Sequence, residues 1–193
     1  MKKNEIRKQV LAKRNALSAA ERKSLSSSII ARVLALDAYH RAGCVMAYVG
    51  FGSEIETMDF IADVLARGKI LVLPRVAPGS DALGIHVVSE PARQLEAGVW
   101  GIRQPRRDLC PEAPPSQVEF VLVPGVAFTR RCERLGYGRG YYDRFIRSRA
   151  TKPPALVAAA LELQVVPRLP MSETDQRVDV VVTESGEYWR SDS

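Results

Sequence analysis

Three glycines alternate with other residues between positions 136 and 140, and this short segment constrains the fold more than any other feature. The surrounding sequence reads RLGYGRGYYDRF, from Arg134 to Phe145. Alternating glycines let backbone N–H groups turn inward in conformations that a residue with a Cβ avoids. Concave arrays of N–H groups bind anions, most often phosphate. Because residues 141–149 have a helical pattern, the positive end of that helix would face the same anion.

The glycine spacing by itself leaves two interpretations open. A tight turn between two elements needs the same residues as an anion site. The chain has neither the Gly-x-Gly-x-x-Gly spacing of dinucleotide-binding folds nor a Gly-x-x-x-x-Gly-Lys-Ser/Thr phosphate loop. An anion site at residues 136–140 is therefore a hypothesis that needs support from the residues around it.

The formal net charge of +6 admits several partners. Basic residues are spread over the N-terminal segment and over residues 103–107, 130–139 and 144–149, rather than gathered in one tail. A solvated basic surface, a nucleic-acid surface and a cleft for a small polyanion all fit this distribution. An RNA-binding module would interleave aromatic residues along an exposed sheet, whereas here they cluster in the glycine segment. We therefore expect no nucleic-acid partner.

The chain has the composition of an ordinary globular protein, with 46% hydrophobic and 26% charged residues. No apolar run approaches the roughly 20 residues that span a bilayer, and no apolar signal core follows the basic N-terminus. The three cysteines lack the spacing of a metal site and are expected to be free thiols. These features predict a cytoplasmic monomer with no membrane partner, folded as one domain over residues 1–193.

Hydrophobic periodicity predicts strands that alternate with helices. Helices are expected over residues 2–17, 18–36, 57–68 and 141–149, with a helical turn at 92–96. Strands are expected over residues 44–49, 69–73, 83–89, 118–123, 155–160 and 178–182. Thr57 is expected to cap the third helix, Pro74 to end the second strand, and residues 105–117 to form a surface loop. This order predicts an α/β fold with an open, mainly parallel sheet and helices on both faces.

The full string from Arg134 to Arg144 closely resembles the signature of the 5-formyltetrahydrofolate cyclo-ligase family, also called methenyltetrahydrofolate synthetases. The preceding segment VLVPGVAF, residues 121–128, is similar to that family as well. The resemblance extends from Lys3 to Glu184 and is weakest over residues 76–118 and the last ten residues. It implies a ligase that uses ATP and Mg²⁺ to convert 5-formyltetrahydrofolate to 5,10-methenyltetrahydrofolate, with ADP and phosphate as the other products.

The resemblance implies a set of ATP-binding residues at the N-terminus and in the glycine segment: Lys3, Arg7, Arg134, Gly136, Gly138, Arg139, Gly140 and Tyr142. Lys3 and Arg7 are four residues apart and share one helix face, which could also be simply a solvated basic face. Their placement over a site requires Ile6 and Val10 to anchor the helix. Arg139 stands where the family often has Lys, and Tyr142 is also compatible with a core position.

The resemblance also implies a folate subsite formed by Val49, Glu54, Trp100, Tyr137 and Tyr141. A carboxylate such as that of Glu54 can accept two N–H bonds from the aminopyrimidinone edge of a pterin. Without the family, Glu54 would be interpreted as an exposed loop acid and Trp100 as a packing residue.

Asp143 and Asp175 are the Mg²⁺ ligands that the resemblance implies. Mg²⁺ is held by one or two carboxylates together with waters and phosphates. Asp143 is equally compatible with a helix-capping charge, and Asp175 with an ordinary loop residue. The family often has His before the second aspartate, where this chain has Thr174. The alternative to an enzyme is a non-catalytic binder of nucleotide or folate that uses the same glycine loop.

Overall fold

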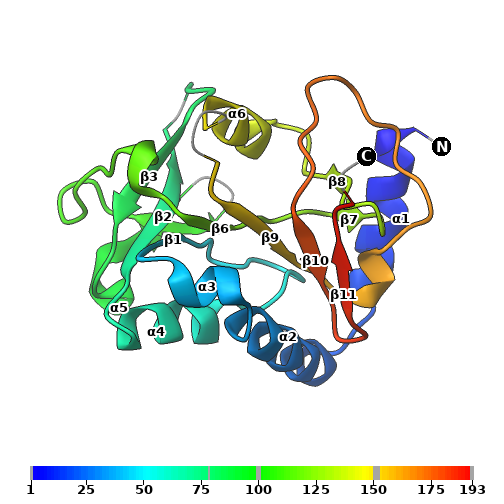
Figure 1. The fold of residues 1–193 in the computed structure, drawn as a ribbon, viewed down its shortest axis with the longest axis horizontal. Helices are drawn as coiled ribbons and strands as arrows, with labels where there is room; N and C mark the ends of the chain where they lie inside the picture. Colours follow the sequence, from blue (N-terminus) through cyan, green and yellow to red (C-terminus); the bar gives the residue numbers. More distant parts are fainter. Residues whose placement is uncertain (1, 78, 99–100, 150–152, 192–193) are drawn as a thin grey trace.

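The computed structural model describes residues 2–77, 79–98, 101–149 and 153–191. Within these residues, a central sheet of seven strands crosses the molecule (Figure 1). Its strands, in spatial order, are β11 (Glu187–Trp189), β10 (Val180–Val182), β9 (Ala155–Ala159), β6 (Phe120–Leu122), β1 (Cys44–Met46), β2 (Ile70–Val76) and β3 (Leu83–Val87).

The inner strands of the sheet are parallel and the two edge strands are antiparallel to their neighbours. Parallel pairing runs from β10 through β9, β6 and β1 to β2. The edge strands β11 and β3 pair antiparallel with β10 and β2. Parallel strands need crossover connections, and helices supply most of them here. The predicted α/β class with a mainly parallel sheet is confirmed.

Helices cover both faces of the sheet, as predicted (Figure 1). The helices α2 (Ala19–Leu34), α3 (Asp37–Arg41) and α4 (Met58–Ala66) lie on one face, and α6 (Tyr141–Ser148) lies on the other. Successive side chains of a strand point to opposite faces. Accordingly, Phe120 and Leu122 of β6 pack in the core shared with α2 to α4, whereas Val121 packs in the core shared with α6. The central strands are therefore apolar on both sides.

The helix α1 (Lys3–Asn15) lies at one end of the sheet rather than on a face (Figure 1). Its buried Ile6 and Val10 pack against Val126, Ala127 and Leu135. Those partners belong to or flank the small hairpin of β7 (Ala127–Phe128) and β8 (Arg134–Leu135), next to the 3₁₀ helix η3 (Glu162–Gln164). The anchoring by Ile6 and Val10 that a role for α1 requires is thus present.

Several short elements were not predicted. They are α3, the ribbon of β4 (Leu95–Ala97) and β5 (Arg103–Pro105), the 3₁₀ helix η2 (Pro115–Gln117), the β7–β8 hairpin and β11, whereas the helical turn expected at residues 92–96 is present as α5 (Pro91–Gln94). Elements of two to five residues are too short for periodicity to identify, and the strands among them exist only through pairing. None of the helices in the described ranges is long and apolar enough to cross a membrane.

Two local predictions were wrong. Strand β2 does not end at Pro74 but continues to Val76, paired with β3. Its pairing with β1 ends at Val72, so the N–H that proline lacks is not needed on that side. Residues 105–117 are not simply a surface loop, because Cys110 and Ala113 are buried. This segment runs along β3, where the N–H of Ala113 donates to Ile85 O, and so covers the sheet edge.

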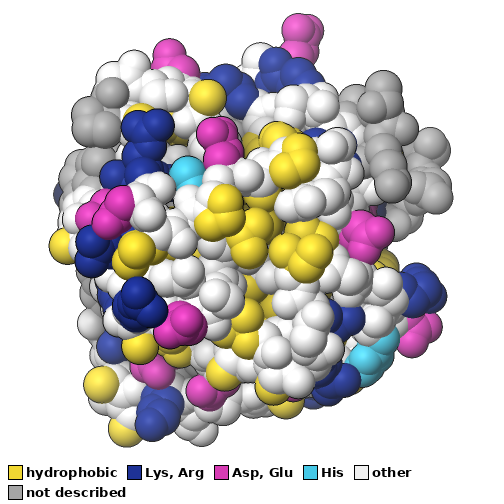
Figure 2. All heavy atoms as spheres, turned by 90° about the vertical axis from the view of Figure 1, so that its left-hand side faces the viewer, with side chains coloured by type: hydrophobic (Ala, Val, Ile, Leu, Met, Phe, Trp, Pro, Cys, Tyr) yellow, Lys and Arg dark blue, Asp and Glu magenta, His cyan; other side chains and the backbone are white. Residues whose placement is uncertain are grey.

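The described surface at the β3 end of the sheet carries no continuous basic patch (Figure 2). Lys and Arg side chains are interspersed there with Asp and Glu, and hydrophobic side chains gather near the centre of the view. This face therefore presents mixed charge, despite the net charge of +6 for the chain.

The three cysteines are buried free thiols, as expected.

Thr57 is the N-cap residue of α4, as expected, but its side chain makes no capping hydrogen bond. Its buried hydroxyl instead donates to Tyr48 O at 2.6 Å and accepts from the N–H of Gly50 at 3.1 Å. The threonine thus holds the segment after β1, which leads to Ser53 and Glu54, against the start of α4.

We expect Thr57→Val to lower the free energy of unfolding by about 1–3 kcal/mol, since it leaves two backbone groups without a buried partner. Thr57→Ser, which keeps the hydroxyl, is the matched control and should lose far less. Urea unfolding followed by circular dichroism measures both. Equal midpoints for Thr57→Val and the unmodified protein would show that these bonds contribute no net stability.

Candidate functional site

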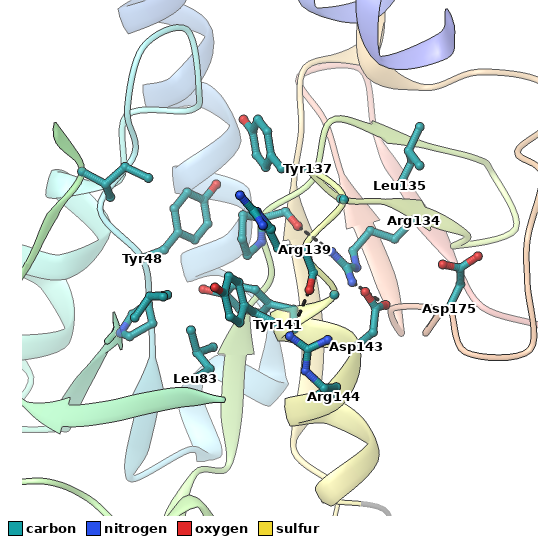
Figure 3. A pocket seen from close by; sticks show the side chains of 18 of the residues that line it. Tyr48, Leu83, Arg134, Leu135, Tyr137, Arg139, Tyr141, Asp143, Arg144 and Asp175 are labelled. Carbon is teal, nitrogen blue, oxygen red and sulfur yellow. Dashed lines mark hydrogen bonds and ion pairs between the residues drawn. The ribbon is translucent and has the colours of Figure 1, made fainter. Parts of the chain in front are cut away.

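One cavity of about 850 Å³ collects the residues that the sequence analysis singled out (Figure 3). It lies among α1, the segment after β1, the ends of β2 and β3, and the glycine loop at residues 136–140 with α6. Every predicted site residue that the structure describes lines it: Lys3, Arg7, Val49, Glu54, Arg134, Gly136, Tyr137, Gly138, Arg139, Gly140, Tyr141, Tyr142, Asp143 and Asp175. Trp100 lies outside the described residues.

The glycine loop forms one wall of this cavity and leads directly into α6. Gly138 and Gly140 have φ values of 104° and 69°, in the left-handed region that favours glycine. Gly140 is the residue that precedes the first turn of α6. Within the described residues, no carbonyl or side chain accepts a hydrogen bond from the N–H of either glycine. The loop is therefore a turn and also a wall with N–H groups available to a ligand.

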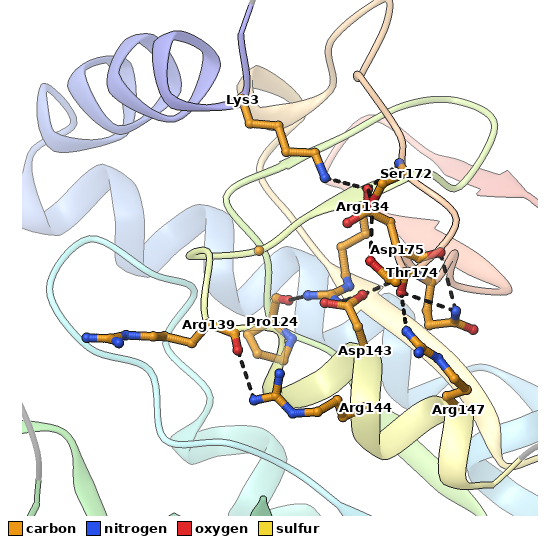
Figure 4. Close-up of polar contacts among 12 residues, drawn as sticks. Lys3, Pro124, Arg134, Arg139, Asp143, Arg144, Arg147, Ser172, Thr174 and Asp175 are labelled. Carbon is orange, nitrogen blue, oxygen red and sulfur yellow. Dashed lines mark hydrogen bonds and ion pairs between the residues drawn. The ribbon is translucent and has the colours of Figure 1, made fainter. Parts of the chain in front are cut away.

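A buried ion pair joins the glycine segment to α6 (Figure 4). Arg134, whose side chain is 3% exposed, donates from Nη2 to Asp143 Oδ1 at 2.6 Å and from Nη1 to Pro124 O at 3.2 Å. The N–H of Gln176 also donates to Asp143 Oδ1, at 3.0 Å. Asp143 is thus more than a helix-capping charge, because it compensates a buried guanidinium and holds the segment at residue 176.

Asp175 lies at the same end of the cavity as Asp143, where residues of α1 and α6 contact it and its loop. Lys3 Nζ forms an ion pair with Asp175 Oδ2, and the N–H and hydroxyl of Ser172 donate to the same oxygen. Burial would raise the pKa of Asp175, but the bonds from Lys3 and Ser172 lower it below its ordinary value. Arg147 Nη2 donates to Thr174 O at 2.8 Å, so α6 holds the loop from its other side (Figure 4).

Arg7 connects α1 to the glycine loop. Its Nε donates to Gly136 O at 2.8 Å, and its Nη1 donates to Asn4 Oδ1 at 2.6 Å. A Cβ on Gly138 would lie 3.4 Å from Arg7 Nη2, which shows how closely the guanidinium approaches the loop. Lys3 and Arg7 therefore face the cavity and not solvent alone, with α1 held over it.

Tyr48 lies across the cavity from Asp175 (Figure 3), and this end of the cavity also holds a buried carboxylate, that of Glu54. Glu54 is 6% exposed and accepts from Tyr137 Oη at 2.6 Å and from the N–H of Phe51 at 3.2 Å. Burial raises its pKa, although the Tyr137 bond and the charge of Arg14 oppose this shift. Burial and the charge of Glu54 raise the pKa of Tyr137 as well. Glu54 is thus not the exposed loop acid that the sequence alone would suggest.

The tyrosines of α6 have distinct surroundings. The hydroxyl of Tyr141 donates to Ser80 O at 3.3 Å. Tyr142 packs against the core beneath α6 and also lines the cavity, so both interpretations of this residue apply. Its hydroxyl is buried and has no hydrogen-bond partner among the described residues, and burial raises its pKa.

Several residues that line the cavity were not predicted from the sequence. They include Tyr48, Phe51, Arg144 and Arg147. Arg147 follows Asp143 by four residues, and this spacing was a usable signal for a shared helix face. Arg144 donates to Arg139 O at 2.9 Å and to Asp81 O at 2.8 Å, which ties the glycine loop to the β2–β3 connection. No local pattern indicates that contact.

Arg75 of β2 is not among the residues that line the cavity. Its Nη1 bonds to Glu96 Oε1 at 2.7 Å and to Pro105 O. The side chain therefore joins β2 to the β4–β5 ribbon.

Comparison with known proteins shows to which family the chain is related. The sequence model of the 5-formyltetrahydrofolate cyclo-ligase family matches residues 1–184. The chain is 30% identical to the 5-formyltetrahydrofolate cyclo-ligase of Mus musculus, with 94% of this chain and 93% of that protein covered. It is 27% identical to that of Escherichia coli strain K12, with 90% and 95% covered.

The NMR structure of Aquifex aeolicus 5,10-methenyltetrahydrofolate synthetase is similar to this fold with a TM-score of 0.84. The two are 34% identical, and the match covers 100% of this chain and 95% of the other. The similarity therefore extends over the sheet, its helices and the cavity-forming segments alike. The chain belongs to the 5-formyltetrahydrofolate cyclo-ligase family.

Proposed function

We propose that the protein is a ligase that converts 5-formyltetrahydrofolate to 5,10-methenyltetrahydrofolate with ATP, releasing ADP and phosphate. The observation that carries the proposal is the composition of one cavity, which joins a glycine loop at a helix N-terminus to a buried carboxylate, Glu54. The first feature suits a phosphate chain and the second suits the N–H edge of a pterin. Membership of the family supplies the reaction that needs both ligands.

The chemistry explains why a nucleotide is needed. The oxygen of the N5 formyl group is a poor leaving group, so ring closure requires its activation. Transfer of the γ-phosphoryl group to that oxygen creates a phosphate leaving group on the formyl carbon. The N10 nitrogen then attacks this carbon, its proton is lost, and phosphate departs as the new C–N bond completes the ring. The protein must hold the γ-phosphate in line with the formyl oxygen, so positioning and neutralisation of charge dominate catalysis.

The basic end of the cavity is the proposed ATP subsite. The N–H groups of Gly136, Gly138 and Gly140 would meet the phosphates, with Arg134, Arg139, Lys3 and Arg7 supplying positive charge and Tyr142 lining the same wall. Arg7 and Arg134 are already oriented by carbonyl or carboxylate partners. Cations held in place before the ligand arrives need little reorganisation when charge develops in the transition state.

The other end is the proposed folate subsite. Glu54 would accept N–H bonds from the pterin, while Val49 provides an apolar wall and Tyr137 and Tyr141 face the junction of the two ligands. The family resemblance adds Trp100 to this subsite. The activated formyl group would thus lie between Glu54 and the glycine loop.

Asp143 and Asp175 fit a Mg²⁺ ion that also binds phosphate. Both line the basic end of the cavity, and no cluster of three or more potential metal-ligating side chains occurs among the described residues. Two carboxylates completed by waters and phosphates suit Mg²⁺ better than an all-protein cage. The bonds from Arg134 and Gln176 both go to Oδ1 of Asp143, so the other carboxylate oxygen would remain to hold the ion. When bound, Mg²⁺ would neutralise charge on the transferring phosphoryl group.

The proposal predicts that purified protein forms the methenyl chromophore from 5-formyltetrahydrofolate only with both ATP and Mg²⁺. Absorbance of the product measures this, with EDTA and nucleotide-free reactions as controls. Equal conversion without nucleotide would contradict the proposed role of ATP. Binding of both ligands with no product would instead favour a non-catalytic binder that uses the same loop.

We expect Asp143→Asn to lower kcat by roughly 10²-fold or more, equivalent to about 3 kcal/mol of barrier. The amide keeps the acceptor for Arg134 but removes the charge that would hold Mg²⁺, so the Mg²⁺ concentration for half-maximal rate should rise. Asp59→Asn is the matched control, because Asp59 is an exposed acid in the first turn of α4. Normal rates and an unchanged Mg²⁺ dependence would limit Asp143 to the ion pair with Arg134.

Arg7→Ala is expected to raise the KM for ATP about tenfold or more while the protein stays folded. The variant loses a guanidinium that lies against the glycine loop and can hold phosphate with two bonds. Added salt should weaken ATP binding more in the unmodified protein than in the variant. The control is Lys8→Ala, which removes an exposed charge next to it on α1. If both variants keep the original KM, the basic face of α1 is merely solvated.

A further inference from the structure

A buried guanidinium near the C-terminal end of α1 is not among the groups proposed to bind ATP, folate or Mg²⁺. Arg14 is 3% exposed. Within the described residues it forms no direct ion pair with a carboxylate, and its charge interacts with that of Glu54 only from a longer distance. Burying a charge without a direct counter-charge is costly, and a residue of this kind calls for a specific reason.

The two hydrogen bonds of Arg14 lead to either side of Glu54. Its Nη2 donates to Tyr137 Oη at 2.9 Å, and its Nε donates to Ser53 Oγ at 3.0 Å. Tyr137 in turn donates to Glu54 Oε1 at 2.6 Å. Ser53 directly precedes Glu54 and donates to Asn15 Oδ1. Arg14 is therefore linked to the Glu54 carboxylate through the hydroxyl of Tyr137. It is linked to the backbone next to Glu54 through the hydroxyl of Ser53.

The direction of the tyrosine bond follows from the donors available. A guanidinium carries only donors, and a phenol carries one donor hydrogen. Since the Tyr137 oxygen accepts from Arg14, its single hydrogen is left for Glu54. Arg14 thereby sets the orientation of the Tyr137 hydroxyl and leaves Glu54 as an acceptor.

We propose that Arg14 is a positioning residue for the folate subsite, which holds Tyr137 and the Ser53–Glu54 backbone so that Glu54 presents its acceptor oxygens to the pterin. This inference rests on the proposed function. It adds a residue that lies outside the glycine segment and does not line the cavity.

Other contacts keep α1 in place independently of Arg14. Ile6 and Val10 are buried against the β7–β8 hairpin, Lys3 pairs with Asp175, and Arg7 bonds to Gly136 O. All of these anchors lie in the first part of the helix. Loss of Arg14 should therefore disturb the folate end of the cavity and leave the basic end intact.

The charge of Arg14 also acts on the ionisation of Glu54. Burial raises the pKa of Glu54, and Arg14 and the Tyr137 bond oppose that rise, while Tyr48 and Tyr142 are the other titratable groups that face this carboxyl. Only the ionised carboxylate accepts two N–H bonds. Its population falls as pH falls through the raised pKa, so removal of Arg14 moves the acid limb of kcat/KM for folate to higher pH.

The test compares Arg14→Met with Lys13→Met, which removes an exposed charge from the adjacent position. Isothermal titration measures 5-formyltetrahydrofolate and ATP separately, so the result does not depend on turnover. We expect the folate Kd of Arg14→Met to rise at least tenfold, or about 1.4 kcal/mol, with the ATP Kd within twofold of the unmodified protein. Lys13→Met should change neither.

Equal losses for folate and ATP would overturn the inference, because they would mean that Arg14 only fastens α1. Unchanged folate affinity in Arg14→Met, with the unmodified protein active, would overturn it while leaving the proposed function intact. An unmodified protein that binds no folate would refute the proposed function and this inference together.

Two further variants keep the test decisive if Arg14→Met folds poorly. Arg14→Lys keeps the charge but not the two-pronged geometry, so its acid limb should stay near that of the unmodified protein while folate affinity falls. Tyr137→Phe removes the connecting hydroxyl. In a double-mutant cycle, Arg14→Lys with Tyr137→Phe should weaken folate binding no more than the stronger single change. Additive effects would show that Arg14 does not act through Tyr137.

Discussion

The packing of Ile6 and Val10 against the β7–β8 hairpin is the contact on which the cavity depends. It holds α1 across the end of the sheet, where the helix supplies Lys3 and Arg7 to the basic end and reaches the segment of Glu54 at its other end. From Lys3 to Arg14 the helix rises about 16 Å, which is enough to extend along a site for two ligands. A short amphipathic helix is only marginally stable alone, so this apolar contact also keeps it helical.

The second constraint is electrostatic. The basic end of the cavity contains Arg134 and Asp143 as a buried pair, and the neighbouring Lys3, Arg144 and Arg147 each bond to a carboxylate or a backbone carbonyl. These partners hold the positive charges in fixed directions around the glycine loop. A phosphate chain would therefore meet an ordered set of donors rather than flexible side chains. At the proposed folate end the arrangement is reversed, because a single buried carboxylate is surrounded by tyrosines and a distant guanidinium.

Much of the fold follows from local sequence patterns. The apolar strands β1, β6, β9 and β10 and the amphipathic helices α1, α2, α4 and α6 were predictable, because their periodicity reflects burial on one or both sides. The β4–β5 ribbon, the β7–β8 hairpin and β11 were not, since each strand contains only two or three residues, too few to show a periodic pattern. The hydrogen bonds of Thr57 were not predictable either, because its hydroxyl bonds to backbone groups of Tyr48 and Gly50 after β1 and not to the helix that follows it.

For the site, the sequence alone shows which residue types are present and that residues 136–140 need the backbone freedom of glycine, and the family motif predicts the ligands and many of the residues that line the cavity. The pairing of Arg134 with Asp143, the burial of Glu54 and the link from Arg14 to Glu54 through Tyr137 become visible only in the folded chain. The reason is physical. A backbone conformation is a local property, whereas burial and hydrogen bonding depend on segments that fold next to one another, here α1, the loop after β1 and the glycine loop.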